Sequence, residues 1–217
     1  RALNARDRRA GWILACRAVP ESDCRIAWDS SVESTNHPLQ RANGRAVDVV
    51  SATADIRIVR VKLDDGVSLS FTAGQYAVVG FGTAAPRDYS MANRPNEPIL
   101  EFHIRRMQGG ATSAYVAREL APGMPVSLEG PYGTCWLRPG PGGPILAIAG
   151  GSGLAPIRSI LREALAVDPS RRIVLYLGAH AEAGLYGLDE FASLARQCPG
   201  LQVVPVVTMA GDMRFRH

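Results

Sequence analysis

Residues 87–90 place a cation, an aromatic ring and a hydroxyl within four positions, as Arg87, Asp88, Tyr89 and Ser90. On a β-strand, side chains alternate between the two faces, so Arg87 and Tyr89 would point one way and Ser90 the other, unless the backbone bends. A guanidinium suits a pyrophosphate, a flat ring suits stacking on another ring, and a hydroxyl can hydrogen-bond a ring nitrogen. The four residues therefore indicate a site for a phosphorylated molecule that carries a flat ring.

Two glycine-rich segments that follow are candidate phosphate sites. Residues 150–156 read GGSGLAP between an apolar strand and an amphipathic helix, the context that a dinucleotide-binding turn requires. Glycine lets backbone N–H groups approach a pyrophosphate, and the N-terminus of a helix adds a favourable dipole. Pro156 replaces the last glycine of the G-x-G-x-x-G pattern and suits the first turn of a helix. Residues 109–113 read GGATS at another expected helix start. For both segments, an ordinary tight turn is the alternative interpretation.

The elements that position the first motifs form a β-rich region. Residues 45–138 contain short, partly alternating strands separated by Gly, Pro and Asp turns, which indicates a small antiparallel barrel or sandwich. One helix, capped by Thr112 or Ser113 and running to Leu120, is expected within it. The polar residues 31–44 read as a linker ahead of this region.

The second glycine-rich segment lies in a region of different rhythm. Within residues 139–217, apolar strands at 145–149, 173–177 and 203–207 alternate with amphipathic helices. Uninterrupted apolar strands of this kind predict an α/β domain whose parallel sheet is covered on both faces. Three strands are few for such a sheet, which indicates that the domain is incomplete at its C-terminal end.

In this order the motifs resemble those of the ferredoxin–NADP reductase superfamily. The resemblance rests on the Arg-x-Tyr-Ser strand, on His103-Ile104-Arg105, on a Gly-Pro-x-Gly turn at residues 130–133 and on the Gly-Leu-Ala-Pro ending of residues 153–156. In that superfamily the Arg-x-Tyr-Ser strand binds flavin and the later glycine-rich turn binds a nicotinamide dinucleotide. The resemblance covers nearly the whole chain.

The resemblance also implies roles for individual residues. Tyr89 would pack on the isoalloxazine of FAD, Ser90 would reach its N5 edge and Arg87 would neutralise the diphosphate, which makes Tyr89 and Ser90 the catalytic candidates. His103 and Arg105 would lie near the flavin diphosphate or ribityl chain, and Ser113 would contact phosphate. The candidates for cofactor binding are Arg87, Tyr89, Ser90, His103, Ile104, Arg105, Gly109, Gly110, Ser113, Gly150, Gly151, Gly153, Leu154, Ala155 and Pro156.

Residues 11–28 resemble the end of a plant-type [2Fe–2S] ferredoxin domain, with Cys16 in a Leu-Ala-Cys motif. Such clusters need four thiolates, spaced C-x4-C-x2-C with a distant fourth. Cys16 would be the fourth ligand, and the other three would precede residue 1. A buried structural cysteine is the alternative. We therefore expect residues 1–30 to be a ferredoxin remnant and the chain to be an internal fragment that cannot hold the cluster by itself.

The arrangement of ferredoxin remnant, flavin barrel and nucleotide domain resembles the reductase components of aromatic-ring dioxygenases. In that family NAD(P)H reduces FAD, and electrons pass singly through a [2Fe–2S] cluster to a ferredoxin or the terminal oxygenase. The implied cofactors are FAD, NADH with NADPH as the alternative, and, in the full-length protein, the cluster. Glu182, in the loop after Gly178, would repel the 2′-phosphate of NADPH, which favours NADH. The alternatives are a flavin-only or flavohaemoglobin-like electron donor and a folded, non-catalytic fragment.

Charge and composition argue against other classes of protein. The chain of 217 residues has a net charge of +4, but residues 1–10 hold four Arg and one Asp, so most of the excess lies in one terminal segment rather than in a nucleic-acid surface. No apolar run is long enough to cross a bilayer and no signal peptide is visible, so we expect a cytoplasmic protein without a membrane partner. The histidines show no spacing typical of a hydrolytic triad or a zinc site.

Overall fold

A computed structural model describes residues 37–138, 142–209 and 212–215, together with residues 6, 9–11, 13, 19, 21–23 and 25; of Met209 and 212–215 only the backbone is described. The chain divides into two units, Arg1–Glu33 and Ser34–His217. Cys16 and most of the expected ferredoxin remnant lie outside the described residues. No helix in the described part is both long and apolar enough to cross a membrane.

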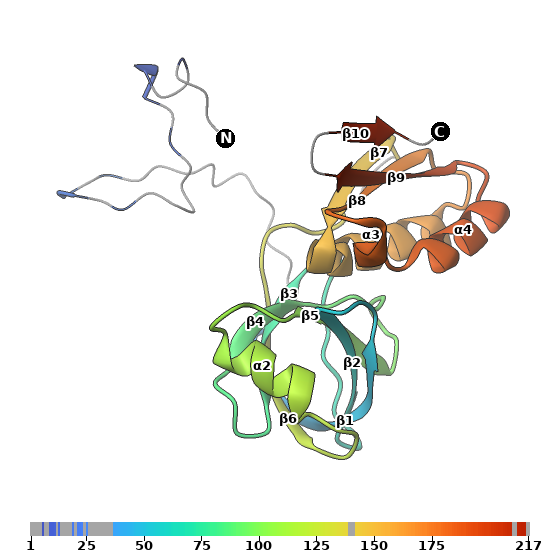
Figure 1. Cartoon of the computed structure of the whole chain (residues 1–217). Helices are drawn as coiled ribbons and strands as arrows, with labels where there is room; N and C mark the ends of the chain where they lie inside the picture. The colour runs from blue at the N-terminus through green and yellow to red at the C-terminus, as the bar shows by residue number, and fades with distance from the viewer. Residues whose placement is uncertain are drawn as a thin grey trace. The chain divides into compact units, whose positions relative to one another are not determined.

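The first half of the second unit is an antiparallel barrel (Figure 1). Its strands lie in the order β4-β3-β6-β1-β2-β5, and a bridge between Met91 and Phe102 brings the two edges together. The predicted antiparallel barrel is thereby confirmed. The strands are β1 (Gln40–Ser51), β2 (Ile56–Leu63), β3 (Tyr76–Phe81), β4 (Arg87–Ser90), β5 (Ile99–Arg105) and β6 (Pro125–Tyr132).

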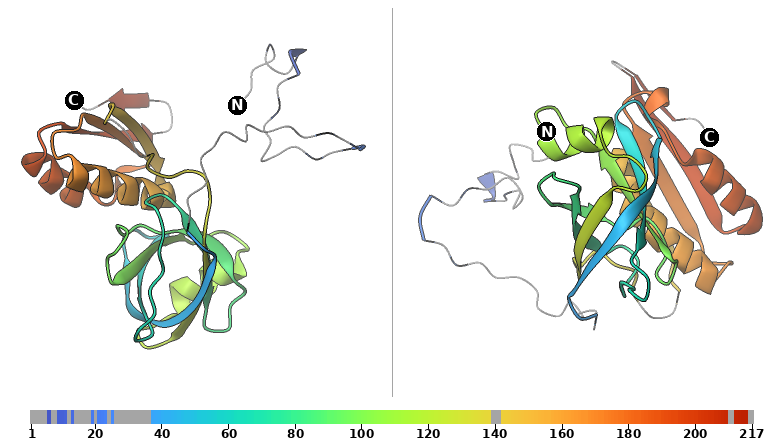
Figure 2. Two further views of the ribbon diagram at one scale, coloured as in Figure 1. Left: turned by 180° about the vertical axis from the view of Figure 1, so that it is seen from behind. Right: turned by 90° about the horizontal axis from the view of Figure 1, so that it is seen from below.

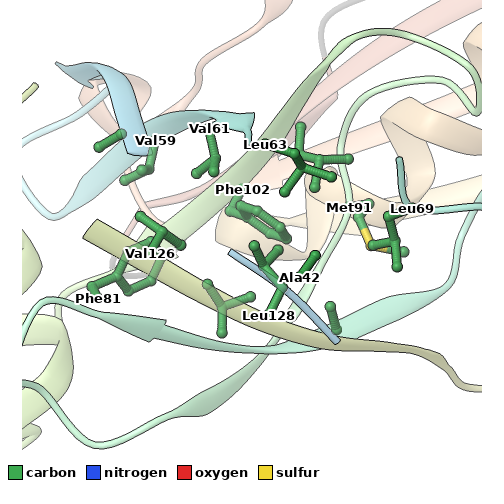
Figure 3. Packing of buried hydrophobic residues seen from close by; sticks show 14 of the residues in the cluster. Ala42, Val59, Val61, Leu63, Leu69, Phe81, Met91, Phe102, Val126 and Leu128 are labelled. Atoms are coloured by element: carbon green, nitrogen blue, oxygen red, sulfur yellow. The ribbon is translucent and has the colours of Figure 1, made fainter. Parts of the chain in front are cut away.

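Apolar side chains that alternate with polar ones along the strands fill the interior of the barrel. On β2, Val59, Val61 and Leu63 are buried, whereas Arg60 and Lys62 are not. The buried side chains meet others from β1, β3, β5 and β6 around a shared apolar core, as Figure 3 shows. The residues labelled there are Ala42, Val59, Val61, Leu63, Leu69, Phe81, Met91, Phe102, Val126 and Leu128.

Strand β1 begins at Gln40, within the stretch that the sequence predicted as linker. Its first six residues pair with β6, from Gln40 opposite Gly130 to Arg45 opposite Pro125. The buried positions here are small, Ala42 and Ala46, so this part of the strand lacks the β-branched signal that marks the others. Gly44 has no room for a side chain, because a Cβ there would lie 2.3 Å from the carbonyl oxygen of Lys62.

Helix α2 (Ala111–Arg118) covers one end of the barrel and buries Val116 in the core. It ends two residues before the predicted Leu120, and the predicted Thr or Ser cap is wrong. Gly110 is the N-cap residue, with no side-chain cap hydrogen bond. The Thr112 hydroxyl donates instead to the carbonyl of Ala85 at 2.9 Å, so it fixes the helix to the loop before β4.

The second half of this unit is an α/β region with the strand order β10-β9-β8-β7. Strands β7, β8 and β9 are parallel, as predicted, while β10 is an antiparallel addition that the sequence did not predict. The elements are β7 (Ile145–Gly150), α3 (Leu154–Val167), β8 (Ile173–Ala179), α4 (Leu188–Gln197), β9 (Leu201–Met209) and β10 (Asp212–Phe215), with 3-10 turns at Gly151–Gly153 and Glu182–Gly184.

Both helices of this region pack on the same face of the sheet (Figures 1 and 2). On that face Ala147, Leu175 and Leu177 meet Leu161 and Phe191 of the helices. On the opposite face Leu146 and Ile148 of β7 are 67% and 73% exposed. Within the described residues, therefore, the sheet is covered on one face rather than on the two that were expected.

Helix α3 is held against the barrel through polar contacts with the loop between β4 and β5. The guanidinium of Arg158 donates to the carbonyl of Ala92 at 2.8 Å, and the Ser159 hydroxyl donates to that of Asn93 at 2.6 Å. Arg162 pairs with Glu97 at 2.8 Å. Because α3 starts at the Gly151–Gly153 turn, these contacts also position that turn.

Candidate cofactor and nucleotide site

A cleft of about 500 Å³ lies where β4, β5 and the start of α2 meet the turn before α3. It brings together most of the side chains that the sequence predicted for the flavin site. Residues more than 60 positions apart in the chain therefore line one space. The lining residues are Arg87, Asp88, Tyr89, His103, Arg105, Met107, Gly109, Gly110, Ala111, Thr112, Ser113 and Ser152.

Strand β4 supplies the charged and aromatic wall of the cleft. Arg87 is exposed, and its guanidinium donates to the carbonyl of Pro86 at 2.9 Å; it forms no salt bridge with any described residue. The ring of Tyr89 is half-buried and lies 5.8 Å from that of Phe81, tilted by 55°. Burial raises the pKa of Tyr89, so its hydroxyl stays protonated at neutral pH. Ser90 pairs with Tyr76 of β3 and is not among the residues that line the cleft.

Strand β5 places its three predicted residues in three different environments. Ile104 is buried in the barrel core, so it could reach a cofactor only through its backbone. Arg105 is exposed on the cleft, and its Nε donates to the Asp55 carboxylate at 2.8 Å. His103 is buried, and both its ring nitrogens face protein groups, Nδ1 the Tyr186 hydroxyl and Nε2 the Glu101 carboxylate. The cofactor contacts of all three stay predictions.

The turn before α2 is shaped for a close approach of a ligand to the backbone. Gly109 has a φ of +72°, and a Cβ there would meet nothing within 4 Å. A Cβ on Gly110 would lie 2.7 Å from the Ser113 hydroxyl oxygen. That hydroxyl accepts from the Met107 N–H at 3.0 Å and donates to the Gly110 carbonyl at 3.1 Å, so Ser113 fixes the turn. With Arg87 and Arg105 beside it, the N-terminus of α2 fits a diphosphate.

The second glycine-rich turn carries β7 into α3. Gly151 has a φ of +53°, and Gly153 is the N-cap residue, without a side-chain cap hydrogen bond or an acidic residue in the first turn. Leu154 and Ala155 are buried, and Pro156 occupies the first turn of the helix. The glycines thus offer backbone to a ligand, while Leu154 and Ala155 anchor the helix. This arrangement fits a dinucleotide phosphate.

The two turns meet at the cleft. Ser152, in the middle of the second turn, lines the same space as Tyr89 and Gly110. A Cβ on Gly151 would lie 3.6 Å from the guanidinium of Arg105. A dinucleotide bound at the second turn would therefore have its phosphates beside the cleft that fits the flavin.

Sequence reasoning missed a buried polar network behind the cleft. Glu101 accepts from Arg60 Nε and Arg158 Nη1, both at 2.9 Å, and from His103 Nε2 at 3.1 Å. Although burial by itself would raise the pKa of Glu101, the hydrogen bond from His103 and the nearby guanidinium groups lower it to about 2. The alternating Glu101-His103-Arg105 pattern was a visible signal, but it gave no indication of the partners from α3 and from the loop before α4.

Comparison with protein families matches both regions. The family described as the oxidoreductase FAD-binding domain matches residues 45–136, and the oxidoreductase NAD-binding domain matches residues 147–214. The first match covers the barrel with its cleft, and the second covers the glycine turn with the parallel sheet.

Curated relatives align with the chain across both regions. The chain is 42% identical over 196 residues to the ferredoxin–NAD(P)+ reductase component of the naphthalene 1,2-dioxygenase and salicylate 5-hydroxylase systems of a Ralstonia species, covering 90% of this chain and 59% of that protein. It is 40% identical over 220 residues to the aromatic O-demethylase reductase subunit of an Amycolatopsis species, covering 99% of this chain and 65% of that protein. The chain thus spans about three fifths of the length of these relatives.

A solved structure agrees. The crystal structure of an Amycolatopsis cytochrome P450 reductase superposes with a TM-score of 0.77 at 38% identity, over 95% of this chain and 63% of that one. The ferredoxin reductase of carbazole 1,9a-dioxygenase gives a TM-score of 0.72 at 27% identity, over 82% of this chain and 54% of that one. The chain belongs to the ferredoxin–NADP reductase family of oxidoreductases, with an FAD-binding domain followed by an NAD-binding domain.

Proposed function

We propose that this chain is the flavin and nicotinamide part of a reductase that passes electrons from NADH through FAD to an iron–sulfur centre, and from there to a ferredoxin or an oxygenase. The observation that supports this most is the shared cleft. Ser152 of the nucleotide turn lines the same space as Tyr89 and Gly110 of the barrel. The relatives described as reductase components of dioxygenase and demethylase systems support the same class of activity.

The redox chemistry would be supplied by bound FAD, which would take up a hydride from NADH, leaving NAD⁺, and would release the two electrons singly and the proton to solvent. The chain contributes position and charge. Arg87 and Arg105 offset the diphosphate charge at the N-terminus of α2, and the half-buried ring of Tyr89 supports the flavin ring. Ser90 is proposed to reach the N5 edge, which requires its hydroxyl to turn toward the cleft.

The domain limits and the iron–sulfur centre belong to the same proposal. We assign residues 1–30 to a ferredoxin remnant, 31–39 to a linker, 40–138 to the FAD-binding barrel and 139–217 to the NAD-binding domain; the pairing of β1 with β6 from Gln40 onward supports a barrel that starts there rather than at residue 45. Cys16 is proposed as one of four cluster ligands in the full-length protein, where the other three cysteines precede residue 1.

We propose NADH as the preferred donor. Glu182 is exposed in the 3-10 turn that follows β8, at the carboxyl end of the sheet where ligands of α/β folds bind. Arg171 and Arg172 lie at the opposite end of that strand, and Nε of Arg171 donates to the carbonyl of Gly143 at 2.9 Å. An acid at the binding end accepts from ribose hydroxyls and repels a 2′-phosphate.

Flavin content and NADH oxidation test the proposal separately. The purified 217-residue chain should bind FAD stoichiometrically and, when loaded, reduce ferricyanide with NADH. It should contain no stoichiometric iron or sulfide, while a chain extended upstream to include the missing cysteines should contain both. A chain that binds no FAD would contradict the reductase function. An extended chain that binds FAD and lacks iron would instead support a flavin-only electron donor.

A further inference from the structure

The hydroxyl of Tyr186 joins the barrel to the nucleotide turn. It lies 3.0 Å from Nδ1 of His103 on β5 and donates to the carbonyl of Gly151 at 3.1 Å. The Tyr186 side chain is buried, and its ring packs edge-on against the imidazole with centroids 5.4 Å apart. One hydroxyl is therefore in contact with both strand β5 and the nucleotide turn.

The segment that carries Tyr186 also packs directly on the start of α3. Gly187, the next residue, has a φ of +77° and is the N-cap residue of α4. A Cβ at Gly187 would lie 3.1 Å from Cδ2 of Leu154, the first residue of α3. The Tyr186–Gly187 segment thus contacts the nucleotide turn at both of its ends, through a hydrogen bond at Gly151 and through close packing at Leu154.

The available partners determine which groups donate and which accept in the contacts between Glu101, His103, Tyr186 and Gly151. Burial raises the pKa of Tyr186 well above its ordinary value, so the hydroxyl keeps its single hydrogen. With that hydrogen donated to the Gly151 carbonyl, the oxygen accepts from His103 Nδ1–H. Nε2 of His103 faces an ionised carboxylate, Glu101, which only accepts, so this nitrogen also carries a hydrogen. The contacts therefore run without a break from Glu101 through His103 and Tyr186 to the carbonyl of Gly151.

We propose that Tyr186 is a positioning residue for the nicotinamide dinucleotide. Held by His103 and Glu101, its hydroxyl fixes the carbonyl of Gly151 and so keeps the N–H groups of the glycine turn directed at the phosphates. The inference rests on the proposed function, because it assumes that the turn binds the dinucleotide. It differs from the sequence interpretation, in which His103 served the flavin directly.

The test compares Tyr186→Phe with wild type in the FAD-loaded full chain. The hydroxyl is lost and the ring is kept, so the Kd for NAD⁺, measured by calorimetry, should rise by about two- to tenfold, as expected for the loss of one neutral hydrogen bond. The KM for NADH should rise by the same factor with kcat nearly unchanged, because uniform binding is lost. The Kd for FAD should stay close to that of wild type.

Two further variants separate positioning from general damage. Tyr176→Phe is the matched control, since Tyr176 is a half-buried tyrosine on β8 whose hydroxyl makes no hydrogen bond to a described residue; its NAD⁺ affinity should equal that of wild type. His103→Gln keeps an amide donor for Tyr186, whereas His103→Leu removes it, so the Leu variant should lose more NAD⁺ affinity than the Gln variant.

The outcomes distinguish this inference from the proposed function. A folded Tyr186→Phe that binds NAD⁺ as tightly as wild type would overturn the positioning role while leaving the reductase function intact. Equal losses in Tyr176→Phe and Tyr186→Phe would overturn it as well. If wild type itself binds FAD but neither NAD⁺ nor NADH, the proposed function fails, and the role of Tyr186 fails with it.

Discussion

The two glycine turns both offer backbone N–H groups to phosphates, yet the protein surrounds them differently. The turn before α2 shares its cleft with Arg87, which is exposed and forms no salt bridge with the described residues. The turn before α3 has no basic residue from Gly150 to Ile157. The next residue, Arg158, faces the interior of the interface, where it pairs with Glu101 and Glu190. Arg105 lies between the turns and is already paired with Asp55.

This difference matches what FAD and the nicotinamide dinucleotide would have to do under the proposed function. Charge-assisted hydrogen bonds are roughly twice as strong as neutral ones, which suits a cofactor that stays bound through many turnovers. A turn that binds through its backbone alone holds a ligand less tightly, which suits a substrate that must leave after each reaction. Under the proposed function, the barrel would therefore retain FAD, and the α/β region would exchange the nicotinamide dinucleotide.

The largest effect is expected at Glu101, which holds the two regions together. Its pKa of about 2 lies below the ordinary 4.5, so the ionised group stabilises the folded state above about pH 4.5, and this contribution is lost as the pH falls from 4.5 toward 2. The shift corresponds to on the order of 3 kcal/mol of unfolding free energy. Glu101→Gln should therefore flatten the loss of stability between these pH values, as measured by urea unfolding.

Glu119→Gln serves as the control for this experiment, because Glu119 is exposed at the end of α2. Its pH dependence of stability should follow that of wild type. If the unfolding free energy of Glu101→Gln depends on pH in the same way as that of wild type, the Glu101 carboxylate does not stabilise the contact between the two regions.

The next largest effect is expected in the affinity for FAD. Arg87→Ala should weaken FAD binding by about 1.5–3 kcal/mol, or roughly tenfold or more, because it removes a charge-assisted contact. Titration of FAD into the apoprotein measures this. Arg172→Ala, which removes an exposed guanidinium just before β8, should leave the Kd unchanged. Equal FAD dissociation constants for wild type and Arg87→Ala would show that Arg87 does not contribute to FAD binding.

A smaller effect is expected at the exchanging site. Gly151 has a φ of +53°, and an L-residue in this left-handed region costs about 1–2 kcal/mol. Because of this strain, Gly151→Ala should shift the backbone of the turn. The NADH affinity should fall by up to about tenfold, while the FAD affinity is retained. Gly66→Ala introduces the same kind of strain at a φ of +79° in an open loop, and it should not change NADH binding. Loss of FAD affinity in Gly151→Ala would contradict the separation of the two sites.

The smallest effect is expected in the preference for NADH over NADPH. We expect kcat/KM for NADH to exceed that for NADPH by several-fold at low ionic strength, because the turn after β8 presents Glu182 rather than a cation. Glu182→Gln should narrow the ratio, while Glu119→Gln should leave it as it is. A preference for NADPH in wild type would show that a cation elsewhere receives the 2′-phosphate.

The sequence predicted the parts of the fold and site that depend on neighbouring residues. The Gly150–Pro156 turn could be recognised because strand, glycines and helix follow one another within a few positions. The barrel could be recognised from alternation such as that of β2. Both predictions use interactions that are local or periodic along the chain.

The parts that were missed depend on distant contacts or small residues. The role of His103 is set by Tyr186, which is 83 positions away, and by Arg158 acting through Glu101. No spacing rule connects such residues before the fold is known. The start of β1 was hidden because Ala42 fills its buried position, and the α2 cap was misassigned because Thr112 bonds to a different loop instead.

The outer face of β7 should affect how strongly molecules of the protein attract one another in solution. Leu146 and Ile148 are 67% and 73% exposed, and they alternate along one strand so that their side chains form a single apolar stripe. Removing such a stripe from contact with water lowers the free energy of the system. Solutions of the 217-residue chain should therefore show attraction between molecules that strengthens on warming and weakens when a charge is introduced at Ile148. For this reason, we expect the association of the chain in solution to depend on its concentration and on temperature.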